Sequence, residues 1–391
     1  MSIQISNDLS MKLLFPYHRR NPLAIAKLLL CDLYYYLYAK LLRRNIDLPK
    51  SLNHILLVNP AHLGDVVIST AILRDLKMQL PNCKVDFLVG DWTAPILKDH
   101  PGVHQTFYIS HWHADRSEEV LTSKKKKYHQ QANKVILELK KGSYDAIFFL
   151  NSYEPSLISL FKEFDCPLIG MVTAGSGPLL SYTGDGSAIH EVQIQASLFT
   201  LWLGKFKDAL QYKPWLKNTP VGEELKTSLG INRPYLVFHP GSGNPAKEWP
   251  IENWIEVIST LAQYEFDIVI TGHGEREKKQ ASLLSGDHVI NLVGQLNFNQ
   301  FISVIEGAKA VLCVDSVAGH IAGAYDKSSV IIGNGLSDIE RWQPLGKEII
   351  LLGKKMPCSP CHSHPCAQRF CVTDITPQML IQQLPDLLGS V

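Results

Sequence analysis

The chain has 391 residues, of which 46% are hydrophobic and 19% are charged, and its formal net charge is +1. This length is typical of two domains rather than one core, and the near-neutral charge gives no reason to expect nucleic acid as a partner. Eight cysteines are too few for a disulfide scaffold at this length. No cleavable signal peptide is recognisable, so we expect a cytoplasmic protein.

The N-terminal extension, residues 1–50, precedes the region in which strands and helices alternate. Leu23 to Leu42 is rich in Leu and Tyr, but Lys27, Asp32 and Lys40 interrupt it. Charges at this density argue against a helix that spans a bilayer. Basic residues flank the segment, which favours an amphipathic helix lying on the anionic surface of the inner membrane. A helix that packs on the protein itself fits the segment equally well.

A first domain is expected over residues 51–213. Short apolar runs and stretches with apolar spacing of three and four predict its elements. The expected strands are 55–58, 85–89, 106–109, 146–150 and 168–170, and the clearest helices are 66–80 and 123–140. Strands that alternate with helices indicate a parallel sheet with right-handed crossovers. The fold class is therefore α/β.

A second domain is expected over residues 234–391, after a linker at 214–233 that is rich in Pro and Gly. The alternation restarts there. Strands are predicted over 235–238, 267–270, 288–290, 310–314 and 329–332, and helices over 251–264, 275–284, 298–305 and 319–325. This order is typical of a second doubly wound domain. Two such domains place their strand ends towards a shared cleft, where a ligand binds.

The loop from His239 to Pro250 carries the strongest chemical signal of the chain. It follows a buried strand, contains Ser242, Gly243 and Lys247, and precedes a helix. Such a loop places backbone N–H groups around a phosphate, and the lysine supplies a positive charge. The loop is not a P-loop, because the G-x-x-x-x-G-K-[ST] order is absent. A phosphorylated ligand is the expected partner.

Gly64 and Asp65 form a second candidate, at the end of the first strand. Gly64 permits a tight turn into the following helix, and Asp65 lies near the helix start. A carboxylate at that place is a candidate general base for a hydroxyl group. An Asp that only caps the helix explains the same residue.

Two further strand ends carry polar residues and glycines. Gly272 and Glu275 follow the 267–270 strand, and an acidic residue there is a candidate acceptor for ribose hydroxyls. A plain helix start fits this segment as well. After the 310–314 strand, the backbone of a helix start is a candidate site for a pyrophosphate. The side chains and glycine at that place are Asp315, Ser316, Gly319 and His320.

Four cysteines gather near the C-terminus, at Cys358, Cys361, Cys366 and Cys371. A C-x-x-C pair followed by two more cysteines supplies the ligand type of a tetrahedral structural zinc site. The spacing is not that of a standard zinc finger, and free thiols in an ordered loop are the competing interpretation.

Taken in this order, the motifs resemble those of the ADP-heptose:lipopolysaccharide heptosyltransferases, glycosyltransferase family nine. The resemblance extends from about Ile55 to the C-terminus. It depends on four segments and on the cysteine cluster, which ends in Thr373, Asp374 and Ile375. The segments are Leu63 to Val66, His239 to Ser242, Lys247 to Pro250, and Val314 to Ser316 with Gly319 and His320.

The resemblance implies a GT-B architecture, in which two Rossmann-like domains face a central cleft. It implies that the N-terminal domain binds a lipopolysaccharide or other glycolipid acceptor and the C-terminal domain binds an ADP-sugar. The resemblance also implies a transfer that inverts the configuration at the anomeric carbon of the sugar and requires no metal cofactor. Asp65 matches the catalytic base and Lys247 matches the lysine that contacts the diphosphate. The remaining matches, on nucleotide-sugar positions, are Ser242, Glu275, Asp315, Ser316 and His320.

Two departures from the family pattern stand out. The family often has Gly directly after the Ser or Thr that follows Asp315, whereas Val317 stands there in this chain and the glycine is at 319. The first fifty residues have no counterpart in the short family members. A transferase or epimerase for another sugar nucleotide remains an alternative, as does a non-catalytic nucleotide-binding protein at the membrane surface.

Overall fold

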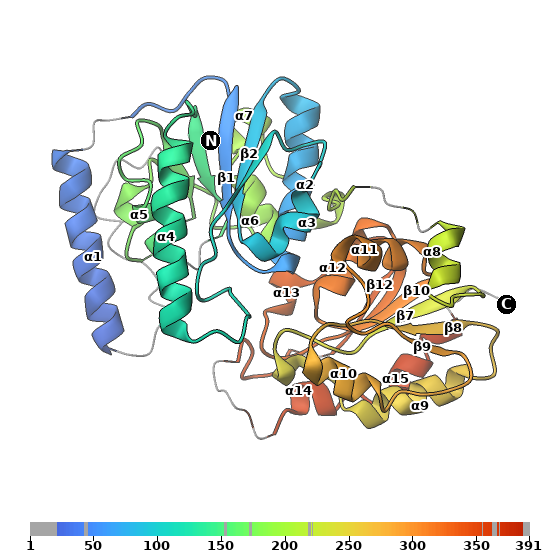
Figure 1. Cartoon of the computed structure of the whole chain (residues 1–391). Helices are drawn as coiled ribbons and strands as arrows, with labels where there is room; N and C mark the ends of the chain where they lie inside the picture. The colour runs from blue at the N-terminus through green and yellow to red at the C-terminus, as the bar shows by residue number, and fades with distance from the viewer. Residues whose placement is uncertain are drawn as a thin grey trace. The chain divides into compact units, whose positions relative to one another are not determined.

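The computed structural model describes residues 22–42, 46–151, 155–171, 174–217, 220, 222–353, 355–361, 366 and 368–385. The chain divides into two compact units, Met1–Asp208 and Ala209–Val391. Each unit consists of one sheet with helices packed on its faces (Figure 1). The segment expected as the linker contains a short helix, α8 (Glu223–Ser228), which the sequence had not indicated.

The sheet of the first unit has six parallel strands in the order β3-β2-β1-β4-β5-β6. Their bounds are β1 (His54–Asn59), β2 (Lys84–Val89), β3 (Gln105–Tyr108), β4 (Ala146–Phe149), β5 (Leu168–Gly170) and β6 (Tyr182–Thr183). Central strands of a parallel sheet are covered on both faces and are therefore apolar throughout. Four successive residues of β1, Ile55 to Val58, accordingly have no exposed surface. The predicted strands of this domain are confirmed, and β6 is an addition.

Helices cover both faces of this first sheet (Figure 1). α4 (Leu121–Leu139) and α5 (Pro155–Ser159) share one apolar core with β1 and β4. On the other face, α2 (Leu63–Gln79) packs with α6 (Glu191–Ser197) and α7 (Thr200–Leu203). Phe148 of β4 stacks there on Phe199, with ring centroids 4.2 Å apart. The short elements η2 (Asp91–Thr93), α3 (Ala94–Leu97) and η3 (Gly177–Leu179) lie in the connections of this unit, and η4 (Ala209–Gln211) begins the second unit.

Helix α1 (Pro22–Leu41) joins the first unit through one side only. Asp32 on that side is fully buried, and its Oδ1 accepts a hydrogen bond of 2.7 Å from the Gly175 backbone N–H. Tyr35 and Tyr38 pack against the core of the unit. The other side exposes a stripe of apolar side chains, namely Leu23, Leu30, Leu33, Tyr34, Leu37 and Leu41. Within the described part of the chain, no helix has the length and apolarity needed to cross a bilayer.

The sheet of the second unit also has six parallel strands, in the order β12-β11-β10-β7-β8-β9. Their bounds are β7 (Tyr235–His239), β8 (Asp267–Ile270), β9 (Val289–Asn291), β10 (Ala310–Val314), β11 (Ser328–Ile332) and β12 (Ile349–Leu352). All five strands predicted for this domain are present. β12 had not been predicted, and it extends the sheet beyond β11 by one edge strand.

Helices cover the two faces of the second sheet (Figure 1). One face holds α9 (Ile251–Leu261), α10 (Glu275–Ala281) and α15 (Pro377–Ile381), with Trp254 fully buried beneath them. The other holds α11 (Phe298–Gly307) and α12 (Val317–Ala324), which pack on each other. The remaining elements are η5 (Pro245–Lys247), α13 (Ile339–Trp342) and α14 (Phe370–Thr373).

Both sheets have the strand order of a doubly wound fold. Counted within each unit, the order is 3-2-1-4-5-6, so the direction of winding reverses between β1 and β4 and between β7 and β10. Ligands of such sheets bind outside the carboxyl ends of the strands at this reversal. The segments that follow β7 and β10 are therefore where a ligand site is expected in the second unit.

Candidate active site

Lys247 and Asp315 come from the two strands at which the second sheet reverses. The loop after β7 leads into η5, whose start is fixed by Asn244, because its side chain accepts a hydrogen bond of 3.1 Å from the Ala246 N–H. Lys247 is the last residue of η5, and Asp315 directly follows β10. The Lys247 Nζ atom lies 2.8 Å from the Asp315 Oδ2 atom. Two residues selected separately in the sequence therefore form one ion pair.

The Asp315 carboxylate has further donors at the end of β11. The Asn334 Nδ2 group donates to Asp315 Oδ2 at 2.9 Å and the Ser337 hydroxyl does so at 3.0 Å. Burial alone would raise the pKa of Asp315, but Lys247 and Asn334 outweigh it, and the pKa falls below its ordinary value. Asp315, Asn334 and Ser337 also line a pocket whose wall includes Trp342. The site thus combines an ionised carboxylate, a lysine and polar hydrogen-bond donors beside a pocket.

A buried glutamate holds the other side of the loop after β7. Glu248 accepts hydrogen bonds from Arg276 Nη2 at 2.7 Å and from Gln280 Nε2 at 2.9 Å. The same Arg276 nitrogen donates to the Ser242 carbonyl oxygen at 2.5 Å. Arg276 and Gln280 belong to α10, so this helix keeps the loop in one conformation. Ser242, predicted as a ligand residue, is buried within this network.

The C-terminal segment contributes the remaining support of the loop. The Arg369 guanidinium donates to the Glu248 carbonyl oxygen, and the Trp249 indole N–H donates to the Ile375 carbonyl oxygen at 2.8 Å. Trp249 is 3% exposed and packs edge-on against Trp254, with ring centroids 5.1 Å apart. Both tryptophans are thus core residues. The loop is therefore fixed from α10 and from the end of the chain.

Close packing explains two glycines near this loop. A Cβ atom on Gly241 would lie 2.2 Å from Glu277 Cδ, and one on Gly272 would lie 2.5 Å from Glu277 Oε2. Burial raises the pKa of Glu277, while the His273 backbone N–H donates to its Oε2 at 2.9 Å. Gly272 is thus required by the Glu277 side chain. Gly243 lies one residue after Ser242, in the loop itself.

Glu275, the candidate ribose acceptor, is the first residue of α10. Its side chain is 78% exposed and lies 2.7 Å from Lys278 Nζ, which lowers the pKa of Glu275. The structure therefore places Glu275 at the solvent-exposed start of α10. Its hydrogen bond is to Lys278 and does not involve Lys247 or Asp315. An exposed carboxylate of this kind is available to a ligand hydroxyl.

The start of α12 brings Ser316, Gly319 and His320 next to Asp315. Ser316 is the residue before the helix, and its Oγ atom is buried without a hydrogen-bond partner among the described residues. The charge of His320 contributes to lowering the pKa of Asp315. A Cβ atom on Gly319 would lie 2.9 Å from Ile331 Cδ1 and 3.0 Å from Pro344 Cγ. Gly319 therefore allows α12 to approach β11 closely.

Asp65, in the first unit, is the third residue of α2. The N-cap residue is His62 and not Asp65, but the Asp65 Oδ2 atom accepts a hydrogen bond of 2.9 Å from the His62 backbone N–H and so caps the helix from its third position. The His62 ring Nε2 lies 3.2 Å from Arg116 Nη2. Burial lowers the pKa of Arg116, and the negative charge of Asp65 opposes that effect. Gly64 precedes Asp65 in the first turn of α2.

The four C-terminal cysteines are thiols without disulfide bonds. Cys361 and Cys371 both lie beside Gly335, since the Cys361 N–H donates to the Gly335 carbonyl at 2.7 Å and Cys371 Sγ is 3.3 Å from the Cβ position of Gly335. Cys358 is exposed. Backbone N–H groups of Arg369 and Gln368 lower the pKa of Cys366. Zinc at these cysteines stays a prediction.

Several residues of the site were not among those selected from the sequence. Asn334 and Ser337 follow β11, the strand beside β10, and the rule that adjacent strand ends gather at one edge would have found them. Glu248 and Arg276 had no comparable signal, because their contact depends on how α10 packs. In the first unit, His62 and Arg116 were missed because their contact also depends on tertiary packing, across 54 residues of sequence.

Comparisons with known proteins agree with this architecture. The family described as Glycosyltransferase family 9 (heptosyltransferase) matches residues 134–371. A lipooligosaccharide heptosyltransferase 2 from Haemophilus ducreyi is 24% identical over 359 residues, which cover 86% of this chain and 99% of that protein. A glycosyl transferase family 9 structure from Veillonella parvula matches with a TM-score of 0.68 and 17% identity, over 88% of this chain and 99% of that one.

A second solved structure, Escherichia coli heptosyltransferase WaaC with ADP, matches with a TM-score of 0.64 and 20% identity. The match covers 85% of this chain and 99% of that chain. These likenesses confirm the expected GT-B fold with its two Rossmann-like units.

Proposed function

The chain belongs to glycosyltransferase family 9, the heptosyltransferase family, and we propose that it transfers a heptose from an ADP-linked donor to the core of a lipopolysaccharide-type glycolipid. The observation that carries this proposal is the Lys247–Asp315 pair, at the strand ends where the second sheet reverses. A nucleoside diphosphate is the ligand class that such a place suits. A related protein of the same fold is described with ADP, which supports adenine as the base.

Lys247 would neutralise the diphosphate of the donor. An ammonium group has three N–H donors, so a bond to Asp315 leaves two for phosphate oxygens. Asp315 fixes the direction of the lysine side chain. Backbone N–H groups at the start of α12, next to Ser316, supply further donors, since the first N–H groups of a helix have no partner inside it. Glu275 would accept from the ribose hydroxyls.

Asp65 would act as the general base of a single inverting displacement. The acceptor hydroxyl oxygen bonds to the anomeric carbon while the bond from that carbon to the phosphate oxygen breaks. Asp65 takes the hydroxyl proton, and ADP leaves with the electron pair, its negative charge held by Lys247. We propose that the chain contributes only side chains and backbone amides to this step, without a metal cofactor.

A donor screen tests the proposal. The purified protein is incubated with ADP-heptose, UDP-sugars or GDP-sugars and with a lipopolysaccharide that lacks core heptose, and products are followed by mass spectrometry. We expect a mass increase of one heptose, with ADP-heptose alone, and undiminished turnover in EDTA. Transfer from a UDP- or GDP-sugar would instead establish the alternative transferase. Donor turnover without any change in acceptor mass would favour an epimerase.

Helix α1 is the part of the chain that we propose contacts the membrane in which the acceptor resides. Leu23, Leu30 and Leu37 are seven residues apart and so lie along one line of the helix. They are 81%, 68% and 46% exposed, on the side away from buried Asp32. Lys27 and Lys40 flank this apolar stripe in the helical projection. An apolar stripe edged by lysines matches an anionic membrane surface.

Vesicle sedimentation tests this attachment. The protein is mixed with vesicles of phosphatidylglycerol and phosphatidylethanolamine, and a Leu30→Ser/Leu37→Ser variant is compared with Leu137→Ser, which changes a leucine of α4 that is 67% exposed. Each leucine contributes roughly 1.5 kcal/mol when it leaves water, so the double variant should bind at least about tenfold more weakly. Equal binding by all three proteins would refute a role for this stripe.

A further inference from the structure

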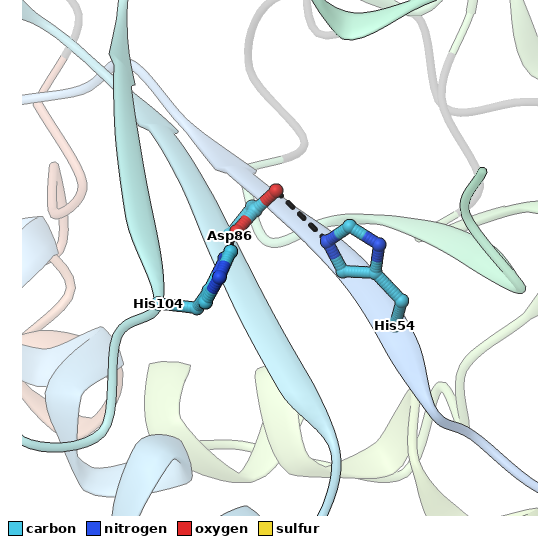
Figure 2. Close-up of side chains that lie close together, drawn as sticks. All are labelled: His54, Asp86 and His104. Carbon is cyan, nitrogen blue, oxygen red and sulfur yellow. Dashed lines mark hydrogen bonds and ion pairs between the residues drawn. The ribbon is translucent and has the colours of Figure 1, made fainter. Parts of the chain in front are cut away.

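A second cluster of chemically competent side chains lies at the opposite end of the first sheet from Asp65. The His54 Nε2 atom is 2.9 Å from Asp86 Oδ2, and the His104 Nδ1 atom is 2.8 Å from Asp86 Oδ1 (Figure 2). The three ligand atoms lie within 4.8 Å of one another. Among the described residues, this is the group of His, Cys, Asp and Glu side chains that meets that spacing.

The parallel sheet itself brings these residues together. His54 begins β1, Asp86 is the third residue of β2, and His104 directly precedes β3. Because β2 lies between β1 and β3, the Asp86 carboxylate is flanked by one imidazole from each neighbouring strand. All three belong to the amino ends of their strands, whereas Asp65 follows the carboxyl end of β1. The cluster is therefore separate from the transfer site.

The surroundings hold the three side chains in place. The Asp145 Oδ2 atom accepts a hydrogen bond of 2.9 Å from the His54 backbone N–H, and the His104 N–H donates to the Val85 carbonyl at 2.7 Å. The Tyr144 hydroxyl donates to Asp86 Oδ2 at 2.9 Å. Ligands that are oriented in advance by such contacts are typical of built metal sites.

The local charge favours a cation. The Asp86 side chain is only 3% exposed, and in this part of the chain its hydrogen-bond partners are imidazoles and a phenol rather than a lysine or arginine. A cation that binds here would neutralise the buried Asp86 carboxylate.

We propose that His54, Asp86 and His104 form a binding site for a divalent transition-metal ion of the zinc class. Two imidazoles and one carboxylate form a common ligand set for Zn²⁺, with water completing the coordination. Two ligand atoms that each lie about 2.1 Å from one ion in tetrahedral geometry are about 3.4 Å apart, so the side chains, now at hydrogen-bond distance, would separate by roughly 0.5 Å around an ion. Each imidazole binds the ion once its ring proton moves to the other nitrogen.

The exposure of the cluster and its position at the amino ends of three strands indicate a structural role for the ion. His54 is 24% exposed and His104 is 46% exposed in their side chains, so an ion reaches the cluster from solvent. The ion would join the amino ends of β1, β2 and β3. A bound ion that joins three strands stabilises the first unit, and it has no part in the transfer step.

Zinc titration of the whole chain tests the site. The protein is prepared without a histidine tag, stripped with EDTA and dialysed, and it carries Cys358→Ser and Cys361→Ser so that the cysteine cluster does not compete. Calorimetry with ZnCl₂ then compares this background with added His54→Ala or His104→Ala. The matched control is His129→Ala, which removes an exposed histidine from α4. Asp86 is left unchanged because it is buried, and substituting it would endanger folding.

We expect about one zinc ion per chain in the background and in the His129→Ala protein, with a Kd below about 10 µM. Either cluster variant should bind at least about tenfold more weakly. Saturating zinc should raise the Tm by about 5 °C in the background but not in the cluster variants. The proposal is overturned if the background protein binds no zinc below 100 µM, or if the cluster variants bind it unchanged.

Discussion

Lys247→Ala is the substitution that most directly tests the reading of the donor site. The variant removes the cation that lies 2.8 Å from Asp315, at the strand ends where a diphosphate is proposed to bind. Loss of one group that stabilises transition-state charge typically lowers kcat by about 10²–10³, or about 2.7–4 kcal/mol. We expect a loss in this range, together with weaker ADP binding.

The same substitution has a worked consequence for stability. Asp315 keeps Asn334 and Ser337 as donors but loses its cation. Both side chains of the pair are partly buried, at 23% exposure for Lys247 and 16% for Asp315. Removing a partner of a fully buried pair costs about 3–5 kcal/mol, and the remaining donors and partial solvation reduce this to roughly 1–2 kcal/mol.

The pH dependence of this stability difference has a definite sign. The pKa of Asp315 is lowered in the folded protein, so its carboxylate stabilises the fold above the pKa of the unfolded chain. That stabilisation is lost as pH falls through the folded-state pKa. Because Lys247 supplies much of the lowering, the Tm difference between wild type and Lys247→Ala should be largest near neutral pH. It should shrink below about pH 4, the ordinary pKa of an aspartate.

The assay is steady-state transfer from ADP-heptose, with ADP affinity by calorimetry and Tm by scanning over pH. The matched control is Lys309→Ala, because Lys309 is exposed just before the amino end of β10, at the opposite edge of the sheet from Asp315. Lys247→Arg keeps the charge and should retain more activity than the alanine variant. Wild-type kcat and ADP affinity in Lys247→Ala would refute the assigned role.

Three further substitutions have expected outcomes. Asp65→Asn should lower kcat by at least about 10² while ADP affinity stays unchanged, and normal turnover would exclude Asp65 as the base. Gly319→Ala should destabilise the protein by about 1–3 kcal/mol, because its Cβ would lie 2.9 Å from Ile331; Gly186→Ala, which has open space, is the control, and equal Tm values would contradict the packing argument. Arg369→Ala should weaken ADP binding several-fold by releasing Glu248, measured by calorimetry; unaltered affinity would show that the loop holds its shape without Arg369.

The fold was largely predictable from the sequence because its strands are short apolar runs with polar ends. β5 (Leu168–Gly170), β8 (Asp267–Ile270) and β10 (Ala310–Val314) begin and end where the sequence predicted. β6 has two residues, too few to show any pattern, and α8 has six residues inside a Pro- and Gly-rich stretch. Tertiary packing, rather than local pattern, decides such short elements.

The candidate site was predictable residue by residue but not as an arrangement. Lys247 and Asp315 were each identified from a strand end followed by a helix. Their contact, between residues 68 positions apart in the sequence, depends on the pairing of β7 with β10. Strand order of this kind cannot be predicted from a local sequence pattern. The burial of Asp32 in α1 is a similar case, since its partner Gly175 lies 143 residues away.

The contacts between the loop after β7 and residues 369–375 affect the order in which parts of the protein fold. Arg369 and Ile375 hold Glu248 and Trp249, yet they follow them by more than 120 residues of sequence. Domains fold from the N-terminus during synthesis, so the first unit can form long before these partners exist. The loop after β7 is therefore expected to reach its final conformation only after residue 375 has left the ribosome, later than the first unit folds.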